Sequence, residues 1–229
     1  MILQTRSLPI SLLASPEPSG ELDLINRLPN PPLRPLSADE IHVRRCRLAG
    51  DAVDSHFGCF RTGDLEHILQ LTHGAPALIG HNRLSIAVAR FFGGNIEPHL
   101  NNKYVVPNFY WPKAHSGAED FRVLLDSGII TEASIAFTFQ KPSCSICGHD
   151  IRECEHEPGV YYHTKLCHYW YDGVERVLEG SFVYRGSEPG TGILAEMKNV
   201  RSELKNRRMK LRLGGKVYEV MPAASVPLD

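Results

Sequence analysis

A serine on an expected strand is the residue of this chain best placed to act as a nucleophile. Ser134 lies in IITEASIAFTF, residues 129–139. Strand alternation separates an apolar face of Ala133, Ile135, Phe137 and Phe139 from a second face of Glu132, Ser134 and Ala136. A small hydroxyl beside Ala136, on a rigid strand, leaves room for a substrate above it. Ordinary half-buried strands show the same pattern, so other residues have to support this interpretation.

A histidine and a glutamate stand out in two other expected strand regions. His81 lies at the start of the connection between the apolar run 77–79 and an expected strand over residues 85–92. Glu179 lies in VERVLEGSFVY, residues 174–184, where alternation places it on one face with Ser181. A turn histidine at the surface and a polar row on an edge strand are the plain alternatives. Taken together with a serine nucleophile, the two side chains indicate chemistry.

A cluster of cysteines and histidines predicts a metal site. Cys144 and Cys147 form a C-x2-C pair, and Cys154 and His156 follow within the segment 141–159. Thiolate and imidazole ligands at such close spacing are typical of a closed tetrahedral Zn2+ site. We expect structural zinc at this insert, because four protein ligands leave no open position for chemistry. The alternative ligands in the same region are His149, His163, Cys167 and His168.

The composition favours one globular domain with appendages. The chain has 229 residues, of which 42% are hydrophobic and 22% charged, and its formal net charge is −1. A balanced charge gives no general attraction to nucleic acid or to an anionic membrane. The apolar run near the N-terminus is interrupted by Pro9, so we expect a cytosolic protein without a membrane span.

Hydrophobic periodicity predicts the elements that must position these side chains. Residues 63–74 favour a short helix with Leu65, Ile68 and Leu69 on one face. A capping-box pattern at Ser116 and Glu119 predicts a second helix that ends at Gly128. Residues 40–59 indicate one or two strands, residues 106–112 a connection, and residues 191–213 a basic amphipathic helix that ends at Gly214-Gly215.

The order of these motifs resembles the prohead maturation proteases of tailed bacteriophages. The motifs are GHN at 80–82, a later Gly-Gly pair at 93–94, DSGIITEASIAF with Ser134, and LEGSFVYRGSEPGTG with Glu179. The similarity covers residues 41–194. The sequence departs from the family pattern at the cysteine insert and at Ala136, where relatives often have glycine.

The resemblance implies an α+β fold similar to the herpesvirus assemblin protease, with a small, mainly antiparallel β-barrel wrapped by helices. It implies that Ser134 is the nucleophile, that His81 is the general base and that Glu179 orients His81. For this third role His99, Asp120 and His168 also stay open. The reaction would be cleavage of scaffold and capsid precursors, with self-cleavage in some cases.

The domain organisation then has three parts. We expect an extended or flexible arm at 1–38, a protease domain at 39–190 that includes the zinc-binding insert 141–168, and a basic helix with a tail at 191–229. The expected partners are phage scaffold and major capsid precursor proteins, together with self-association, and neither a membrane nor a nucleic acid. The expected location is the host cytoplasm, inside the assembling prohead. The alternative function is a non-catalytic, zinc-braced module for assembly or nucleic-acid binding.

Overall fold

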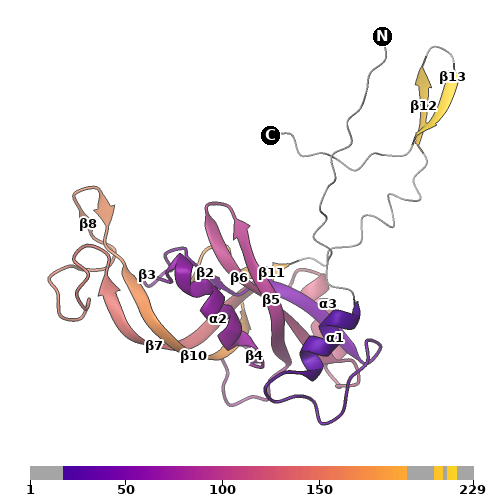
Figure 1. Ribbon diagram of the computed structural model, residues 1–229, viewed down its shortest axis with the longest axis horizontal. Coiled ribbons are helices and arrows are strands. Elements are labelled where there is room, and N and C mark those ends of the chain that lie inside the picture. The colour runs from indigo at the N-terminus through magenta and orange to yellow at the C-terminus, as the bar shows by residue number, and fades with distance from the viewer. Residues whose placement is uncertain (1–17, 195–208, 214–215, 221–229) are drawn as a thin grey trace. The chain divides into compact units, whose positions relative to one another are not determined.

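The computed structural model describes residues 18–194, 209–213 and 216–220. The chain divides into two units, residues 1–194 and 195–229, and each is described by itself. The first unit is an α+β fold around one nine-stranded sheet (Figure 1). Because the sheet is curled and mainly antiparallel, it forms a half-barrel.

The nine strands of the large sheet span most of the first unit. They are β1 (Ile41–Arg47), β2 (Ala49–Gly50), β3 (Gly58–Cys59), β4 (Pro76–Ile79), β5 (Ala89–His99), β6 (Asn102–Pro112), β7 (Glu132–Cys144), β10 (Tyr169–Val183) and β11 (Gly192–Leu194). Their order is β11-β1-β6-β5-β4-β10-β3, while β2 pairs with β6 and β7 pairs with β10. The pairs β4–β10 and β3–β10 are parallel, and all the others in this sheet are antiparallel.

The strands β7 and β10 form a long antiparallel ribbon that carries the cysteine insert at its far end (Figure 1). A small hairpin of β8 (Tyr161–Tyr162) and β9 (Lys165–Leu166) lies within this insert. The insert therefore connects the strand that bears Ser134 to the strand that bears Glu179.

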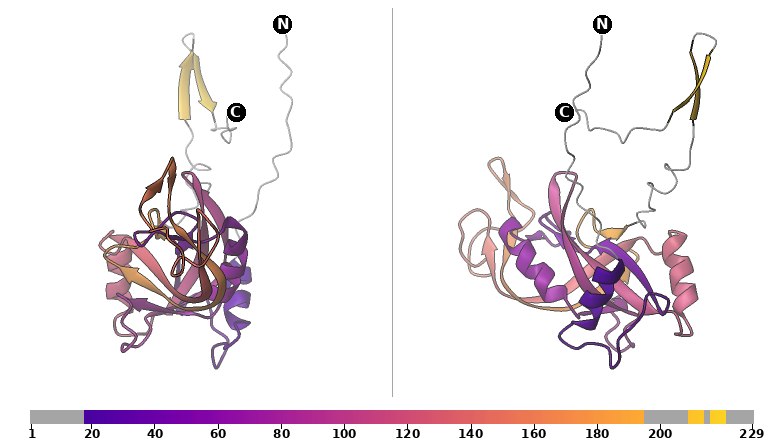
Figure 2. Two further views of the ribbon diagram at one scale, coloured as in Figure 1. Left: turned by 90° about the vertical axis from the view of Figure 1, so that its left-hand side faces the viewer. Right: turned by 45° about the vertical axis from the view of Figure 1, so that its right-hand side comes forward.

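Three α-helices pack at separate places on the sheet in the described part of the chain (Figures 1 and 2). They are α1 (Pro18–Asn26), α2 (Leu65–Thr72), which follows the 3-10 turn η1 (Thr62–Asp64), and α3 (Ala118–Asp126). The prediction of α2 is confirmed, since Leu65, Ile68 and Leu69 are buried. The prediction of α3 is also confirmed, but Gly117 is its N-cap and no side chain caps it.

Aromatic side chains fill the concave side of the sheet. Phe91, Phe109, Trp111 and Phe182 are almost fully buried in one cluster, against which Ile135 and Val177 pack. Phe137 and Phe139 pack in a neighbouring cluster that also contains the α2 side chains. Burial of several large rings provides most of the hydrophobic free energy of such a core. The alternation predicted for β7 is thus confirmed, because its apolar face lies in the core.

The structure shows the expected β-barrel in part and corrects the predictions for two segments of the sheet. The sheet is a half-barrel, and the Ile193 N–H of β11 donates at 2.9 Å to Thr131 O, just before β7. The segment 106–112, expected to be a connection, belongs to β6, and the strand expected over residues 85–92 is β5, which starts later and continues through Gly93-Gly94. Positive φ angles of 48° and 101° at these glycines fit the register shift there, so the pair marks a bulge rather than an end.

The predictions for both ends of the chain also need correction. The segment 1–38 is not wholly an arm, because α1 forms within it and Ile25 is fully buried against Phe92. Residues 191–213 are not one helix, because β11 lies at their start and β12 (Met209–Leu213) at their end. In β12 the apolar residues alternate with Lys210 and Arg212, which is the period of a strand. It pairs with β13 (Lys216–Val220), and the rest of this segment lies outside the described residues.

Candidate active site and metal cluster

The register of three neighbouring strands brings the predicted catalytic residues to one face of the sheet. Ser134 of β7 lies directly opposite Ser181 of β10, and Ala136 lies opposite Glu179. On the other side of β10, Leu78 of β4 is in register with Ser181. Side chains at directly paired positions point to the same face. Since Ala133 and Phe182 point into the core, Ser134, Glu179 and Ser181 all lie on the opposite face.

A bulge in β10 is what places Glu179 on this face. Val177 pairs with Phe137 on the core side, and the next pair along the ribbon is Glu179 with Ala136. Leu178 is therefore the extra residue of the bulge, and it is 38% exposed. Glu179 and Ser181 share a face, as the alternation predicted, but Val177 lies on the other face because the inserted residue changes the face of every residue before it.

His81 is held in a tight turn at the end of β4. Gly80 and His81 both have positive φ angles, of 60° and 57°. The Gly80 N–H donates to Phe182 O at 2.9 Å, and the His81 N–H donates to Ser181 Oγ at 3.0 Å. The left-handed conformation costs a non-glycine residue about 1 kcal/mol, so its presence at His81 is a feature that the surrounding contacts must stabilise.

His81 and Glu179 form a close pair, although 98 positions separate them in the sequence. His81 Nδ1 lies 2.6 Å from Glu179 Oε1, and the Ser181 hydroxyl donates to Glu179 Oε2 at 2.7 Å. The Glu179 side chain is 2% exposed, whereas that of His81 is 38% exposed. A buried carboxylate on Nδ1 keeps the proton on that nitrogen and leaves Nε2 as an acceptor on the exposed side of the ring.

Ser134 is a half-buried neighbour of this pair. Among the described residues, its hydroxyl forms no hydrogen bond, either with His81 or with any other group. It faces the pair across Ser181, which is its direct partner on β10. Catalytic hydrogen bonds are often absent in a free enzyme and form when a substrate binds. The structure thus places a hydroxyl without a hydrogen bond on the strand next to the one that carries Glu179, the partner of His81.

The alternative third residues do not approach His81. His99 packs against Tyr104 at the end of β5, Asp120 lies in the first turn of α3, and His168 packs edge-to-face against Trp170 at the start of β10. Glu179 is the acidic residue in contact with His81.

A groove of about 380 Å³ adjoins the buried carboxylate. Its walls come from β4, from the bulge of β10 and from the exposed loop after His81; they are lined by Pro76, Leu78, Arg83, Ser85, Ala87, Leu178 and Glu179. The walls are mostly apolar, and Arg83 has no ion pair among the residues described. A groove of this size takes one or two large side chains of a peptide.

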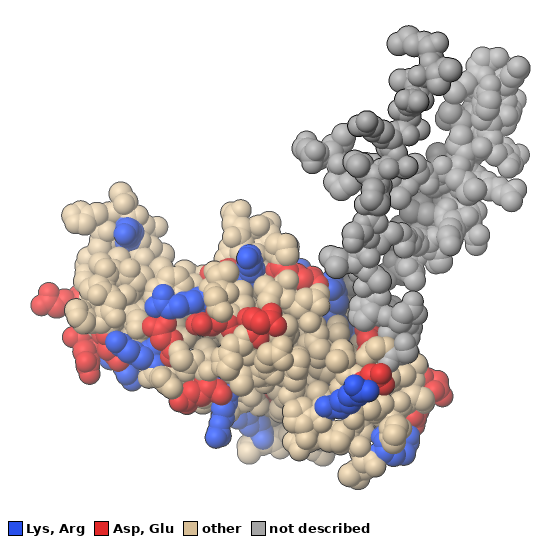
Figure 3. Space-filling view, in the orientation of Figure 1, with Lys and Arg blue, Asp and Glu red and all other residues tan. Residues whose placement is uncertain are grey.

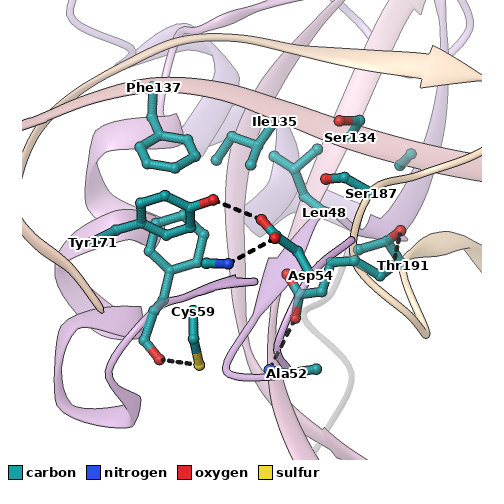
Figure 4. Close-up of a pocket in the computed structure, with 14 residues that line it drawn as sticks. Leu48, Ala52, Asp54, Cys59, Ser134, Ile135, Phe137, Tyr171, Ser187 and Thr191 are labelled. Atoms are coloured by element: carbon teal, nitrogen blue, oxygen red, sulfur yellow. Dashed lines mark hydrogen bonds between the residues drawn. The ribbon is translucent and has the colours of Figure 1, made fainter. Parts of the chain in front are cut away.

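A smaller cavity of about 30 Å³ lies near the free edge of β7, and Ser134 and Ser187 are at one end of it (Figure 4). The Tyr171 hydroxyl donates to Asp54 Oδ2 at 2.6 Å inside it. Glu188 accepts the N–H groups of Gly50 and Ala52 at 2.7 and 3.1 Å. Burial raises the pKa of Glu188 to about 8, and the charges of Asp54 and Asp51 act in the same direction. This cavity has the volume of about one water molecule, so it is not a site for a peptide.

The cysteine insert brings four potential metal ligands together. The ligand atoms of Cys144, Cys147, Cys154 and His156 all lie within 4.8 Å of one another. A tight knuckle holds the first pair, because Ile146 N–H donates to the Cys144 sulfur at 3.4 Å and Gly148 has a φ of 77°. A small contraction of the cluster would give Zn–S and Zn–N bonds of about 2.0–2.3 Å. The structure thus supports metal binding, while it does not identify the metal.

Two further observations fit a metal ion at this cluster. His156 Nδ1 is buried and has no hydrogen-bond partner. Burial opposes ionisation of the Cys144 thiol, but hydrogen bonds from the backbone at Cys147 and Ile146 outweigh burial and lower its pKa. Cys167 is also close, with its sulfur 3.9 Å from that of Cys144.

The described part of the face drawn in Figure 3 carries charges of both signs. Lysine and arginine are interspersed with aspartate and glutamate over the described part of the face in Figure 3. None of the described helices is long and apolar enough to cross a membrane.

Comparisons with protein-family models, with curated proteins and with solved structures each found no match for this chain. The interpretation of the site therefore depends on its own geometry, in which an oriented histidine lies beside a serine on a curled antiparallel sheet.

Ser181 is the residue of this site that the sequence did not assign. The sequence placed it on the face of Glu179 without giving it a role. Its hydrogen bond to Glu179 lies within β10, but its bond from the His81 N–H depends on the parallel pairing of β4 with β10, which alternation within one strand does not show. The available signal was the spacing of Glu179 and Ser181 by two residues, which predicts two side chains on one face of a strand.

Proposed function

We propose that this protein is a serine endopeptidase in which Ser134 is the nucleophile, His81 the general base and Glu179 the residue that orients His81. The observation that carries the proposal is the contact of 2.6 Å between His81 Nδ1 and the buried Glu179 carboxylate, one strand away from an unpaired serine hydroxyl. A base oriented by a third group, close to a hydroxyl, is the arrangement required for nucleophilic catalysis on an acyl group.

The steps of the reaction follow from these positions. Nε2 of His81 accepts the proton of the Ser134 hydroxyl while its oxygen attacks the carbonyl carbon of the peptide bond. The imidazolium formed is stabilised by Glu179, and it then gives the proton to the leaving amine. Water, activated by the same histidine, hydrolyses the acyl-enzyme and regenerates Ser134.

The substrate proposed is a protein rather than a small ester. The groove over β4 and β10 is open and borders Glu179, so an extended chain can cross the site with a side chain in the groove. Because the sequence motifs resemble those of prohead maturation proteases, we propose scaffold and capsid precursors as the substrates. The cleavage would take place inside the assembling prohead. Self-cleavage and self-association belong to the same proposal.

The metal proposed for the cysteine cluster is structural zinc. Cys144, Cys147 and Cys154 with His156 would hold it as a closed tetrahedral site at the end of the β7–β10 ribbon. Its contribution is to the folding of the insert, since it leaves no position for a substrate.

The first test does not require a known substrate. A fluorophosphonate probe reacts with an activated serine when the oxygen attacks phosphorus and fluoride leaves. We expect intact-mass analysis to show one added probe on the wild type and none on Ser134→Ala or His81→Ala. Ser127→Ala, which removes an exposed serine at the end of α3, is the matched control and should react as the wild type does.

Co-expression with a capsid or scaffold precursor is the second test. Precursor cleavage seen with the wild type and absent with Ser134→Ala would support the proposal. If neither the probe nor the precursor distinguishes the wild type from Ser134→Ala, the non-catalytic, metal-braced module becomes the better interpretation.

A further inference from the structure

The Ser181 hydroxyl uses its hydrogen-bonding capacity on both members of the His81–Glu179 pair. It donates its proton to Glu179 Oε2 at 2.7 Å and accepts the backbone N–H of His81 at 3.0 Å. The residue is only 1% exposed, so water does not compete for these contacts. A hydroxyl has one proton to donate and two lone pairs to accept with, and here the donor and one lone pair are directed at the catalytic pair.

We propose that Ser181 is a positioning residue that fixes the Glu179 carboxylate and the His81 main chain relative to each other. The inference depends on the proposed function of His81 and Glu179, and it assigns Ser181 no contact with the substrate. The role of Ser181 thus differs from that of the proposed nucleophile, Ser134, which lies directly opposite it on β7.

The first effect of Ser181 is on the carboxylate. Glu179 Oε1 contacts His81 Nδ1, and Oε2 accepts from Ser181, so both oxygens have one fixed partner. Rotation of the carboxylate about its last bond would break both contacts. In a buried site an unpaired carboxylate oxygen is costly, so loss of the Ser181 hydroxyl favours rotation or displacement of Glu179.

The second effect is on the backbone of His81. This residue has a φ of 57°, a conformation that must be stabilised by its surroundings. The turn is attached to β10 by two hydrogen bonds, from Gly80 N–H to Phe182 O and from His81 N–H to Ser181 Oγ. Without the second bond, the main chain of His81 loses the hydrogen bond that lies nearest to its Cα and fixes the position of the imidazole.

The position of Ser181 joins these two effects. It lies two residues after Glu179 on the same face of β10, and its neighbour on β4 is Leu78, three residues before His81. A single hydroxyl can therefore reach the side chain of one catalytic residue and the main chain of the other.

The test compares three variants by two readouts. Ser181→Ala removes the hydroxyl, and Ser181→Cys keeps a side chain of similar size with a much weaker donor. Thr72→Val is the matched control, because it removes another fully buried hydroxyl, on α2, without touching the pair. The readouts are the rate of fluorophosphonate labelling and the downfield proton NMR signal of the His81 Nδ1–H.

We expect Ser181→Ala to lower the labelling rate about 10- to 100-fold, because small displacements of catalytic groups have effects of this size. The Nδ1–H signal should shift or broaden, and Ser181→Cys should be intermediate in both readouts. Thr72→Val should lower only the unfolding temperature. If a substrate peptide is known, the loss should appear in kcat while KM changes less than about twofold.

The proposal is overturned if Ser181→Ala or Ser181→Cys retains both the wild-type signal and a labelling rate within twofold of it. Should Ser181→Ala fail to fold, Ser181→Cys decides the question. A wild type that is not labelled, but whose Nδ1–H signal still responds to Ser181→Ala, would reject the proposed function and retain the positioning of the pair.

Discussion

Replacing Glu179 by glutamine tests the orientation of His81 with the smallest change of shape. Glu179→Gln keeps the size of a side chain that is only 2% exposed, but it exchanges one carboxylate oxygen for an NH2 group. Two orientations of the amide are then available, and each conflicts with one observed contact. If the NH2 faces His81, Nδ1 must accept a hydrogen bond, and the ring proton moves to Nε2, where it prevents base catalysis. If the NH2 faces Ser181, the hydroxyl loses the acceptor for its proton.

The magnitude follows from which contact is lost. The wrong tautomer of the histidine costs about 10⁴ in rate in a serine protease triad, which corresponds to about 5 kcal/mol of transition-state stabilisation. The second orientation keeps the correct tautomer and removes the negative charge that stabilises the imidazolium. We therefore expect a loss of about 10³–10⁴ in the rate of labelling by a fluorophosphonate, with a change in unfolding free energy of only about 1–2 kcal/mol because one hydrogen bond is weakened.

The assay is fluorophosphonate labelling, followed by intact mass, for Glu179→Gln beside Glu97→Gln. Glu97 is the carboxylate of an ion pair with Arg45 on the strands β5 and β1, away from the site, so its variant should label at the wild-type rate. A labelling rate for Glu179→Gln within tenfold of the wild type, in a folded protein, would refute the role given to Glu179.

Three other outcomes are expected. Cys144→Ser should remove most of about one equivalent of zinc, measured by elemental analysis, and lower the unfolding temperature more than the rate of labelling; a metal-free wild type of unchanged stability would contradict this. The pKa of Glu188 is raised from 4.5 to about 8, so between these two pH values the folded state keeps a proton that the unfolded chain has released. The free energy of unfolding should therefore fall as the pH rises through this range, by at most about 5 kcal/mol. Urea unfolding at pH 5 and pH 8.5 should show this fall in the wild type, and a fall of equal size in Glu188→Gln would exclude Glu188 as its source. Leu178→Glu should raise KM for a peptide about tenfold by placing a charge in the groove, whereas Val123→Glu, on the exposed side of α3, should leave KM unchanged.

The sequence was sufficient to predict local features that depend on one element. The helices α2 and α3 and the alternation of β7 follow from apolar spacing, and the structure confirms them. The cysteine cluster was also predictable, because its four ligands lie within 13 residues of sequence and the spacing limits where they can go. In each case the information lies within a single short stretch.

Features that depend on the pairing of several elements could not be predicted from the sequence. The bulge at Leu178 reverses the faces of β10, and only the pairing with β7 reveals it. The strand β6 was missed because it contains two prolines and is apolar on both faces, as buried strands are. The helix expected over residues 191–213 failed at Met209–Leu213, where alternation and a Gly-Gly pair favour a hairpin.

The parallel pairing of β4 with β10 has a consequence for how the protein folds. The strand β5 is joined to its sheet neighbours β4 and β6 by short connections, but His81, just after β4, and Glu179 of β10 are separated by 98 positions. Contacts between distant parts of a chain form slowly, since the long intervening loop must close first. A chain still emerging from the ribosome can form the hairpin of β5 and β6, yet it has no oriented histidine until residues 169–183 have been synthesised. If the proposed function is correct, this order of folding delays proteolysis until the domain is complete.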